Sequence, residues 1–173
     1  PRVPTTYKPG VFPVGDRLSE HTGLQVYTDG SKIDDGVGAG YVIVDDGDGQ
    51  VTRMKVAGYQ TVNRSEMVAQ LAVLMDIPYD LALSSYTDSK CSIQKLIAWI
   101  TDPASLEGDK HQDIIRDIAA LTAQRTGTFR LRKFPAHRDI RWNEVADKAA
   151  KSAAKPPPSD NLPARGADRP QRE

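Results

Sequence analysis

The stretch VYTDGSKIDDG, from Val26 to Gly36, decides how the fold begins. Its apolar lead predicts a strand, and the Gly/Asp pairs that follow predict a turn into a second strand. Asp29 lies inside this stretch. An aspartate at a strand end is ordinary turn chemistry. Its meaning therefore depends on whether other carboxylates of the chain reach the same point.

The rest of the chain extends this strand into an α/β pattern. Residues 36–46 and 50–62 alternate as two further strands, and DDGDGQ (45–50) predicts the hairpin turn between them. Helical spacing follows at 64–76, then a strand at 80–88, helices at 89–100 and 111–125, a strand at 128–136 and an Ala-rich helix at 141–155. This order predicts an antiparallel hairpin sheet extended by parallel strands, with helices on its faces.

The composition is typical of one folded domain flanked by segments without regular structure. The chain has 173 residues, of which 39% are hydrophobic, and a formal net charge of zero. We expect a linker over 1–23, one domain over 24–155 and a disordered Pro-rich tail over 156–173. No apolar run is long enough to span a membrane. The single cysteine, Cys91, permits a reducing intracellular compartment. Because the charges balance, affinity for a polyanion has to come from a local patch.

Two glycine-containing motifs resemble a calcium loop and a dinucleotide-binding loop, but neither has the full pattern. DDGDGQ resembles the start of a calcium loop, but no glutamate stands at the twelfth position, where Val56 or Ala57 falls. GVGAG (Gly36–Gly40) is not GxGxxG and leads into a strand, so it is a weak dinucleotide motif.

Four acidic residues occupy special places in this layout. Asp29 lies in the first strand, Glu66 in the first turn of the first helix, and Asp88 at the end of the fourth strand. Asp147 follows Asn143 by four residues on the last helix, so both face the same way. Each acid alone is explained by a turn or by the helix dipole. Together they would repel one another unless a cation intervenes, and hard carboxylates without His or Cys favour Mg²⁺ or Mn²⁺.

The motifs YTDGS (27–31), NRSE (63–66), YTDS (86–89) and AHRDIRWNEVADKAA (136–150) together resemble type 1 ribonuclease H. More narrowly, they resemble the RNase H domains of retroelement reverse transcriptases, of the non-LTR class. The resemblance implies a mixed five-stranded sheet in the order 3-2-1-4-5 and cleavage of the RNA strand in RNA/DNA hybrids. It also implies a covalently linked reverse transcriptase in the parent protein. We expect the isolated domain to be a monomer.

The resemblance also assigns roles to residues. It implies two Mg²⁺ ions, which Mn²⁺ can replace, on Asp29, Glu66, Asp88 and Asp147. His137 matches a loop histidine that assists proton handling or product release, although the loop after it, RDIRW, lacks the usual glycines. Substrate contacts would come from Gly30, Ser31, Thr61, Asn63 and Asn143. Two other readings stay open: a catalytically idle nucleic-acid-binding module, and a resolvase or integrase nuclease.

Basic and aromatic residues near the last helix leave further alternatives. They form either a phosphate track or a solvated strand face: Arg125, Arg130, Arg132, Lys133, Arg138 and Arg141. Trp99 and Trp142 either stack on nucleic acid or belong to the core.

Overall fold

The computed structural model describes residues 24–45, 48–133 and 141–155. The predicted linker (1–23), the predicted tail (156–173) and the His137 loop lie outside the described residues. No helix within the described ranges is long and apolar enough to cross a membrane.

The sheet has five strands in the order β3-β2-β1-β4-β5. β1 pairs antiparallel with β2 and parallel with β4, so it is the central strand. The predicted α/β class and the 3-2-1-4-5 order are confirmed. The strands are β1 (Leu24–Ile33), β2 (Gly36–Asp45), β3 (Asp48–Lys55), β4 (Leu83–Thr87) and β5 (Phe129–Lys133).

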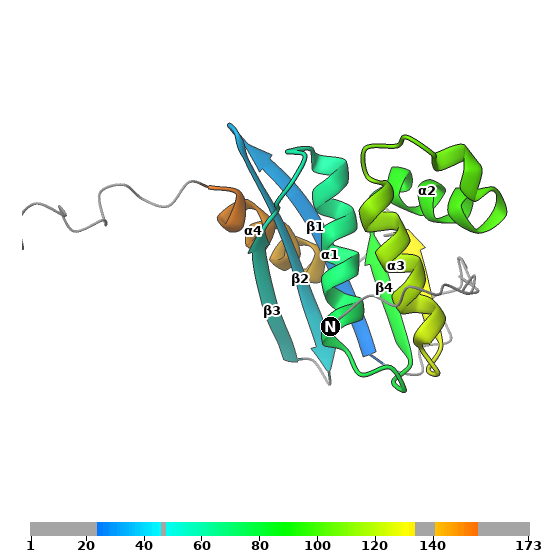
Figure 1. Cartoon of the computed structure of the whole chain (residues 1–173). Helices are drawn as coiled ribbons and strands as arrows, with labels where there is room; N and C mark the ends of the chain where they lie inside the picture. The colour runs from blue at the N-terminus through cyan, green and yellow to red at the C-terminus, as the bar shows by residue number, and fades with distance from the viewer. Residues whose placement is uncertain (1–23, 46–47, 134–140, 156–173) are drawn as a thin grey trace, which may run out of the picture.

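Helices cover both faces of this sheet. They are α1 (Val62–Asp76), α2 (Lys90–Thr101), α3 (Gln112–Gln124) and α4 (Arg141–Ala154), with a short 3-10 helix, η1 (Pro103–Leu106), between α2 and α3. In Figure 1, α1 and α3 lie in front of the sheet, while α4 lies behind β1, β2 and β3.

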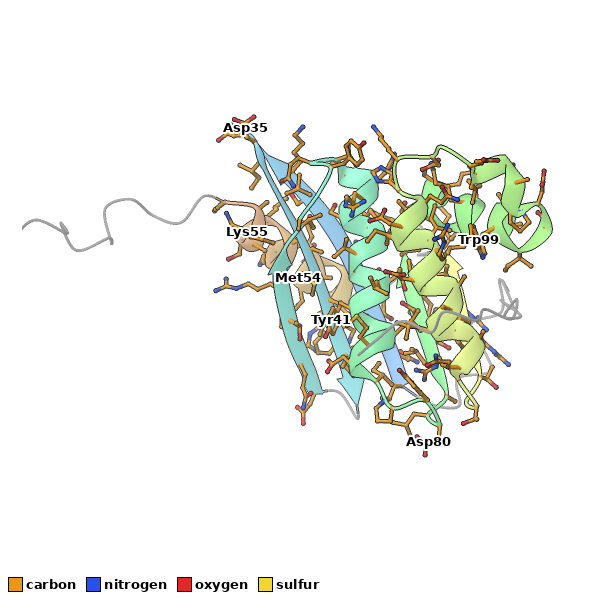
Figure 2. The ribbon with its side chains drawn as sticks, viewed as in Figure 1. Asp35, Tyr41, Met54, Lys55, Asp80 and Trp99 are labelled. Atoms are coloured by element: carbon orange, nitrogen blue, oxygen red, sulfur yellow. The ribbon has the colours of Figure 1, made fainter. Side chains whose placement is uncertain are left out.

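The main core fills the space between the sheet and the helices on its front face. Met67 and Leu74 of α1, Ile118 of α3 and Leu83 of β4 are all buried in it. Trp99 belongs to the same cluster, with 8% of its surface exposed (Figure 2). Trp99 is therefore a core residue and does not stack on nucleic acid.

The GVGAG run gives α4 room to lie on β2. A Cβ on Gly38 would sit 2.3 Å from the carbonyl oxygen of Ala150, and one on Gly40 would sit 2.7 Å from the Ala150 nitrogen. Only a residue without a side chain permits such close backbone approach. The glycines thus serve helix packing, and the same approach brings the Asp147-bearing helix onto the sheet.

Two predicted boundaries are wrong in an informative way. β3 ends at Lys55 rather than near residue 62, because the chain turns at Gly58, whose φ is +86°. α1 begins at Val62 rather than Arg64, because the Thr61 hydroxyl accepts a hydrogen bond from the Arg64 N–H (3.1 Å) and caps the helix. Glu66 consequently lies in the second turn of α1.

Candidate metal centre

Asp29 is held within β1 and is not a strand-end residue. The strand continues to Ile33, and Asp29 pairs with Gly40 in the β1–β2 ladder. Its side chain is 6% exposed, and its Oδ1 accepts a hydrogen bond from the Gly30 N–H at 2.8 Å. A carboxylate is thereby fixed in the central strand, largely away from solvent.

Gly30 allows α1 to bring Glu66 beside Asp29. A Cβ on Gly30 would lie 2.1 Å from Ser65 Oγ and 2.8 Å from the Glu66 nitrogen, so no other residue fits between β1 and this turn of α1. Glu66 is 5% exposed, and its Oε2 has no hydrogen-bond partner among the described residues. A buried carboxylate oxygen without a partner is costly, which points to a ligand.

Asp88 completes a cluster of three carboxylates. It follows the last residue of β4 and is exposed. One carboxylate oxygen from each of Asp29, Glu66 and Asp88 lies within 4.8 Å of the others. The cluster therefore joins the central strand, the adjacent parallel strand and the helix that packs on them.

Asp147 contacts Asp29, a member of this cluster. It lies on α4, where its Oδ2 is 2.9 Å from Nζ of Lys151. A side-chain hydrogen bond with Asp147 is among the interactions that raise the pKa of Asp29. Within the described residues, the three acids whose oxygens all lie within 4.8 Å of one another do not include Asp147, which contacts both Asp29 and Lys151; its place as a fourth metal ligand stays a prediction.

Burial and mutual repulsion raise the pKa values of the two enclosed acids. Desolvation and the nearby Asp88 charge raise the pKa of Asp29 to about 7. Desolvation, followed by the charges of Asp29 and Asp88, raises the pKa of Glu66 as well. The pair therefore holds on to a proton near neutral pH. A divalent cation would replace that proton, and oxygen-only donors fit Mg²⁺ or Mn²⁺.

The proposed substrate residues lie on β1, at the start of α1 and on α4. Asn63 is exposed on the first turn of α1, and Ser31 is partly exposed on β1. Asn143 is partly exposed on α4, one turn before Asp147. The Thr61 hydroxyl caps α1 and lies 3.2 Å from Nε2 of His111. At Gly30, the N–H is already used by Asp29.

Among the described basic residues near β5, Arg132 and Arg125 are not available to a phosphate track. Arg132 is only 4% exposed, so it lies in the interior. Arg125 donates to the backbone carbonyls of Ile77 (3.2 Å), Pro78 (3.1 Å) and Leu81 (2.6 Å), and so ties the end of α3 to the loop between α1 and β4. Lys133 is exposed, the Arg141 guanidinium lies 4.6 Å from the centre of the Trp142 ring, and Arg138 lies outside the described residues.

The sequence patterns missed two buried polar residues of α1, the helix that carries Glu66. Arg64 is 7% exposed and donates to both carboxylate oxygens of Asp113 (2.8 and 3.1 Å), which joins α1 to α3. Gln70 is fully buried one turn beyond Glu66. Both positions carry polar residues on the packed side of a helix, and that interruption of the apolar stripe is the signal that could have found them.

Comparison with known protein families agrees with this geometry. The RNase H family model matches residues 21–155, which covers every described strand and helix. No curated protein matches the chain.

Proposed function

We propose that this chain, which belongs to the RNase H family, hydrolyses the RNA strand of RNA/DNA hybrids with the help of divalent metal ions. The cluster of Asp29, Glu66 and Asp88 within 4.8 Å carries the proposal. Three acids this close, two of them buried, destabilise the fold by repulsion and desolvation unless cations are bound. Such a cluster suits a hydrolase that works on a phosphodiester.

Each carboxylate takes a distinct role in this proposal. Asp29 would help to hold both Mg²⁺ ions, because it belongs to the cluster and also contacts Asp147. Glu66 and Asp88 complete one site, and Asp147 helps to hold the other. The chemistry that these residues would gain from bound cations is activation of the attacking water and stabilisation of the leaving 3′ oxygen. The products are 3′-hydroxyl and 5′-phosphate ends, and Mn²⁺ can replace Mg²⁺.

Recognition of the hybrid rests on groups around the cluster. Only the 2′-hydroxyls distinguish RNA from DNA, and they lie in a wide, shallow minor groove. We assign their contacts to backbone groups of Gly30 and Ser31 and to the exposed side chain of Asn63. Thr61 holds a phosphate of the DNA strand, Asn143 contacts the RNA strand, and His137 assists proton handling or product release.

Two other functions use the same fold differently. A catalytically idle module would only position nucleic acid, but an idle site gains nothing from keeping buried carboxylates in mutual repulsion. A resolvase or integrase would cut DNA. The His137 position and the Asn143-to-Asp147 spacing favour RNase H over these nucleases.

A panel of end-labelled substrates tests the proposal. The chain is incubated with RNA/DNA hybrid, duplex RNA and duplex DNA, each with Mg²⁺, Mn²⁺ or chelator. We expect cleavage of the hybrid alone, in its RNA strand, and only with metal. Cleavage of duplex DNA would favour the resolvase reading, and binding without cleavage would favour the idle module.

The narrower assignment to a retroelement is also a proposal. The residues of the motifs NRSE (63–66) and AHRDIRWNEVADKAA (136–150) support this assignment. The assignment implies a reverse transcriptase linked to this domain. Immunoblots of the source cells with an antibody to this chain test the link. We expect the antibody to detect a larger polypeptide that also extends a primer on an RNA template.

A further inference from the structure

Gln70 sits beneath the carboxylate cluster and contacts two of the elements that carry it. It is fully buried on α1, four residues after Glu66, and so lies on the same side of the helix one turn further along. Its Nε2 donates to Thr28 Oγ1 at 2.8 Å, and its Oε1 accepts from Ser85 Oγ at 2.6 Å. Thr28 precedes Asp29 on β1, and Ser85 lies three residues before Asp88 on β4.

The backbone ladder between these two strands ends just short of the cluster. The last β1–β4 pair is Tyr27 with Tyr86, so Asp29 and Asp88 lie beyond the paired region. At this point the Thr28 hydroxyl donates to the Tyr86 carbonyl oxygen at 3.0 Å, which continues the connection by a side chain. Side-chain bonds, not the ladder, therefore hold the two strand ends where the carboxylates project.

This chain of hydrogen bonds, from Ser85 through Gln70 and Thr28 to the Tyr86 carbonyl, is buried. Thr28, Gln70 and Ser85 are each at most 1% exposed, and each has a partner for the polar group it buries. Hydrogen bonds in such surroundings are directional and exchange little with water, so a satisfied network fixes one arrangement. Replacing such a network by apolar side chains of the same shape is often neutral or stabilising, so stability alone does not explain its presence.

We propose that Gln70 is a positioning residue for the metal centre: it sets the spacing of Asp29, Glu66 and Asp88 by linking β1, α1 and β4. The inference rests on the proposed function. A carboxylate cluster binds a small cation tightly only when its oxygens are held at fixed separations, and Mg²⁺ demands near-ideal geometry. Loss of outer contacts that orient metal ligands typically weakens metal affinity by about 10–100-fold.

Mn²⁺ alone is the probe, titrated into the full chain and followed by calorimetry. The double variant Gln70→Met with Ser85→Ala removes the link and leaves the Thr28 bond to the Tyr86 carbonyl in place. We expect the Mn²⁺ dissociation constant to rise about tenfold, while the unfolding equilibrium constant in chelator changes by less than about tenfold. The Mn²⁺ concentration that gives half-maximal hydrolysis should rise, with KM for the hybrid unchanged.

Val73→Ala is the matched control. Val73 is fully buried on the same helix and makes no bond in this network, so its truncation should lower stability without changing the Mn²⁺ dissociation constant. If Val73→Ala weakens Mn²⁺ binding as much as the double variant does, the effect is general loosening and the inference is overturned.

The milder variant Ser85→Ala covers the case in which the double variant does not fold. It separates Gln70 from β4 only, and we expect Mn²⁺ affinity to fall about threefold, a fraction of the full effect. Wild-type affinity in the folded variant, alongside normal binding by the unmodified chain, overturns the inference while the proposed function stands. An unmodified chain that binds no Mn²⁺ overturns the proposed function itself.

Discussion

Replacing Asp29 by Asn should stabilise the metal-free protein even though it removes activity. The pKa of Asp29 is raised from its ordinary value of 3.8 to about 7 in the folded chain. An acid whose pKa is higher folded than unfolded binds more protons in the folded state, so stability falls as pH rises between the two values. Asparagine is neutral at every pH and does not carry this penalty.

The size of the effect follows from the shift. A change of roughly three pKa units corresponds to about 4 kcal/mol at most, at 1.36 kcal/mol per unit. Asp29 is 6% exposed, so solvent screening reduces this little. Glu66 shares the proton with Asp29, and the penalty for burying the Glu66 charge stays in the variant. We therefore expect the free energy of unfolding to rise by about 2–4 kcal/mol above pH 7. The gain should shrink from pH 7 downward and vanish near pH 3.

Urea unfolding in chelator, at pH 3.5, 5.5 and 8, measures this gain. At pH 8 the variant should also melt roughly 6–12 °C higher than the wild type. Asp35→Asn, at the exposed tip of the β1–β2 hairpin (Figure 2), is the control and should stay within about 0.5 kcal/mol. If Asp29→Asn is no more stable than wild type at pH 8, the carboxylates do not repel one another as the geometry requires.

Four other perturbations test separate parts of the structure. Mn²⁺ should raise the melting temperature of the wild type but not of Asp29→Asn, because metal bound only to the folded state stabilises it; equal shifts would place the metal elsewhere. Gly38→Ala should cost about 3 kcal/mol or more in urea unfolding, since its Cβ would meet the Ala150 carbonyl at 2.3 Å, whereas Gly108→Ala, with nothing within 4 Å, should cost only the roughly 1–2 kcal/mol of its positive φ. Arg64→Met should cost about 2–3 kcal/mol by removing the paired bonds to Asp113, and a cost under about 0.5 kcal/mol would show that this pair joins nothing. Hybrid binding, measured by fluorescence anisotropy, should be weak and fall steeply between 50 and 200 mM salt at this zero net charge, and a tight, salt-insensitive complex would contradict it.

The fold could be predicted because local patterns and topology agree. Alternation, Gly/Asp turns and helical spacing located the strands and α-helices to within a few residues, except for the end of β3, and the β1–β2–β3 hairpins leave β1 central. The exceptions are tertiary effects. Arg132 alternates like a solvated residue yet is buried, and GVGAG serves the approach of α4 rather than a ligand.

The sequence predicted which residues form the candidate site better than it predicted how their side chains are arranged. Asp29, Glu66 and Asp88 could be chosen because the strand order brings their elements together, and the structure places them within 4.8 Å. The pairing of Asp147 with Lys151 depends on side-chain rotamers, which no sequence pattern fixes. The position of Gln70 on the packed side of α1 can be read from the sequence, but its bonds to Thr28 and Ser85 cannot, because they depend on side-chain rotamers.

Anomalous diffraction from crystals soaked in Mn²⁺ tests the central claim most directly. We predict one Mn²⁺ peak among the oxygens of Asp29, Glu66 and Asp88, and a second, weaker peak on the Asp147 side of Asp29. Peaks elsewhere on the molecule, with the three carboxylates left without metal at saturating Mn²⁺, would contradict the account.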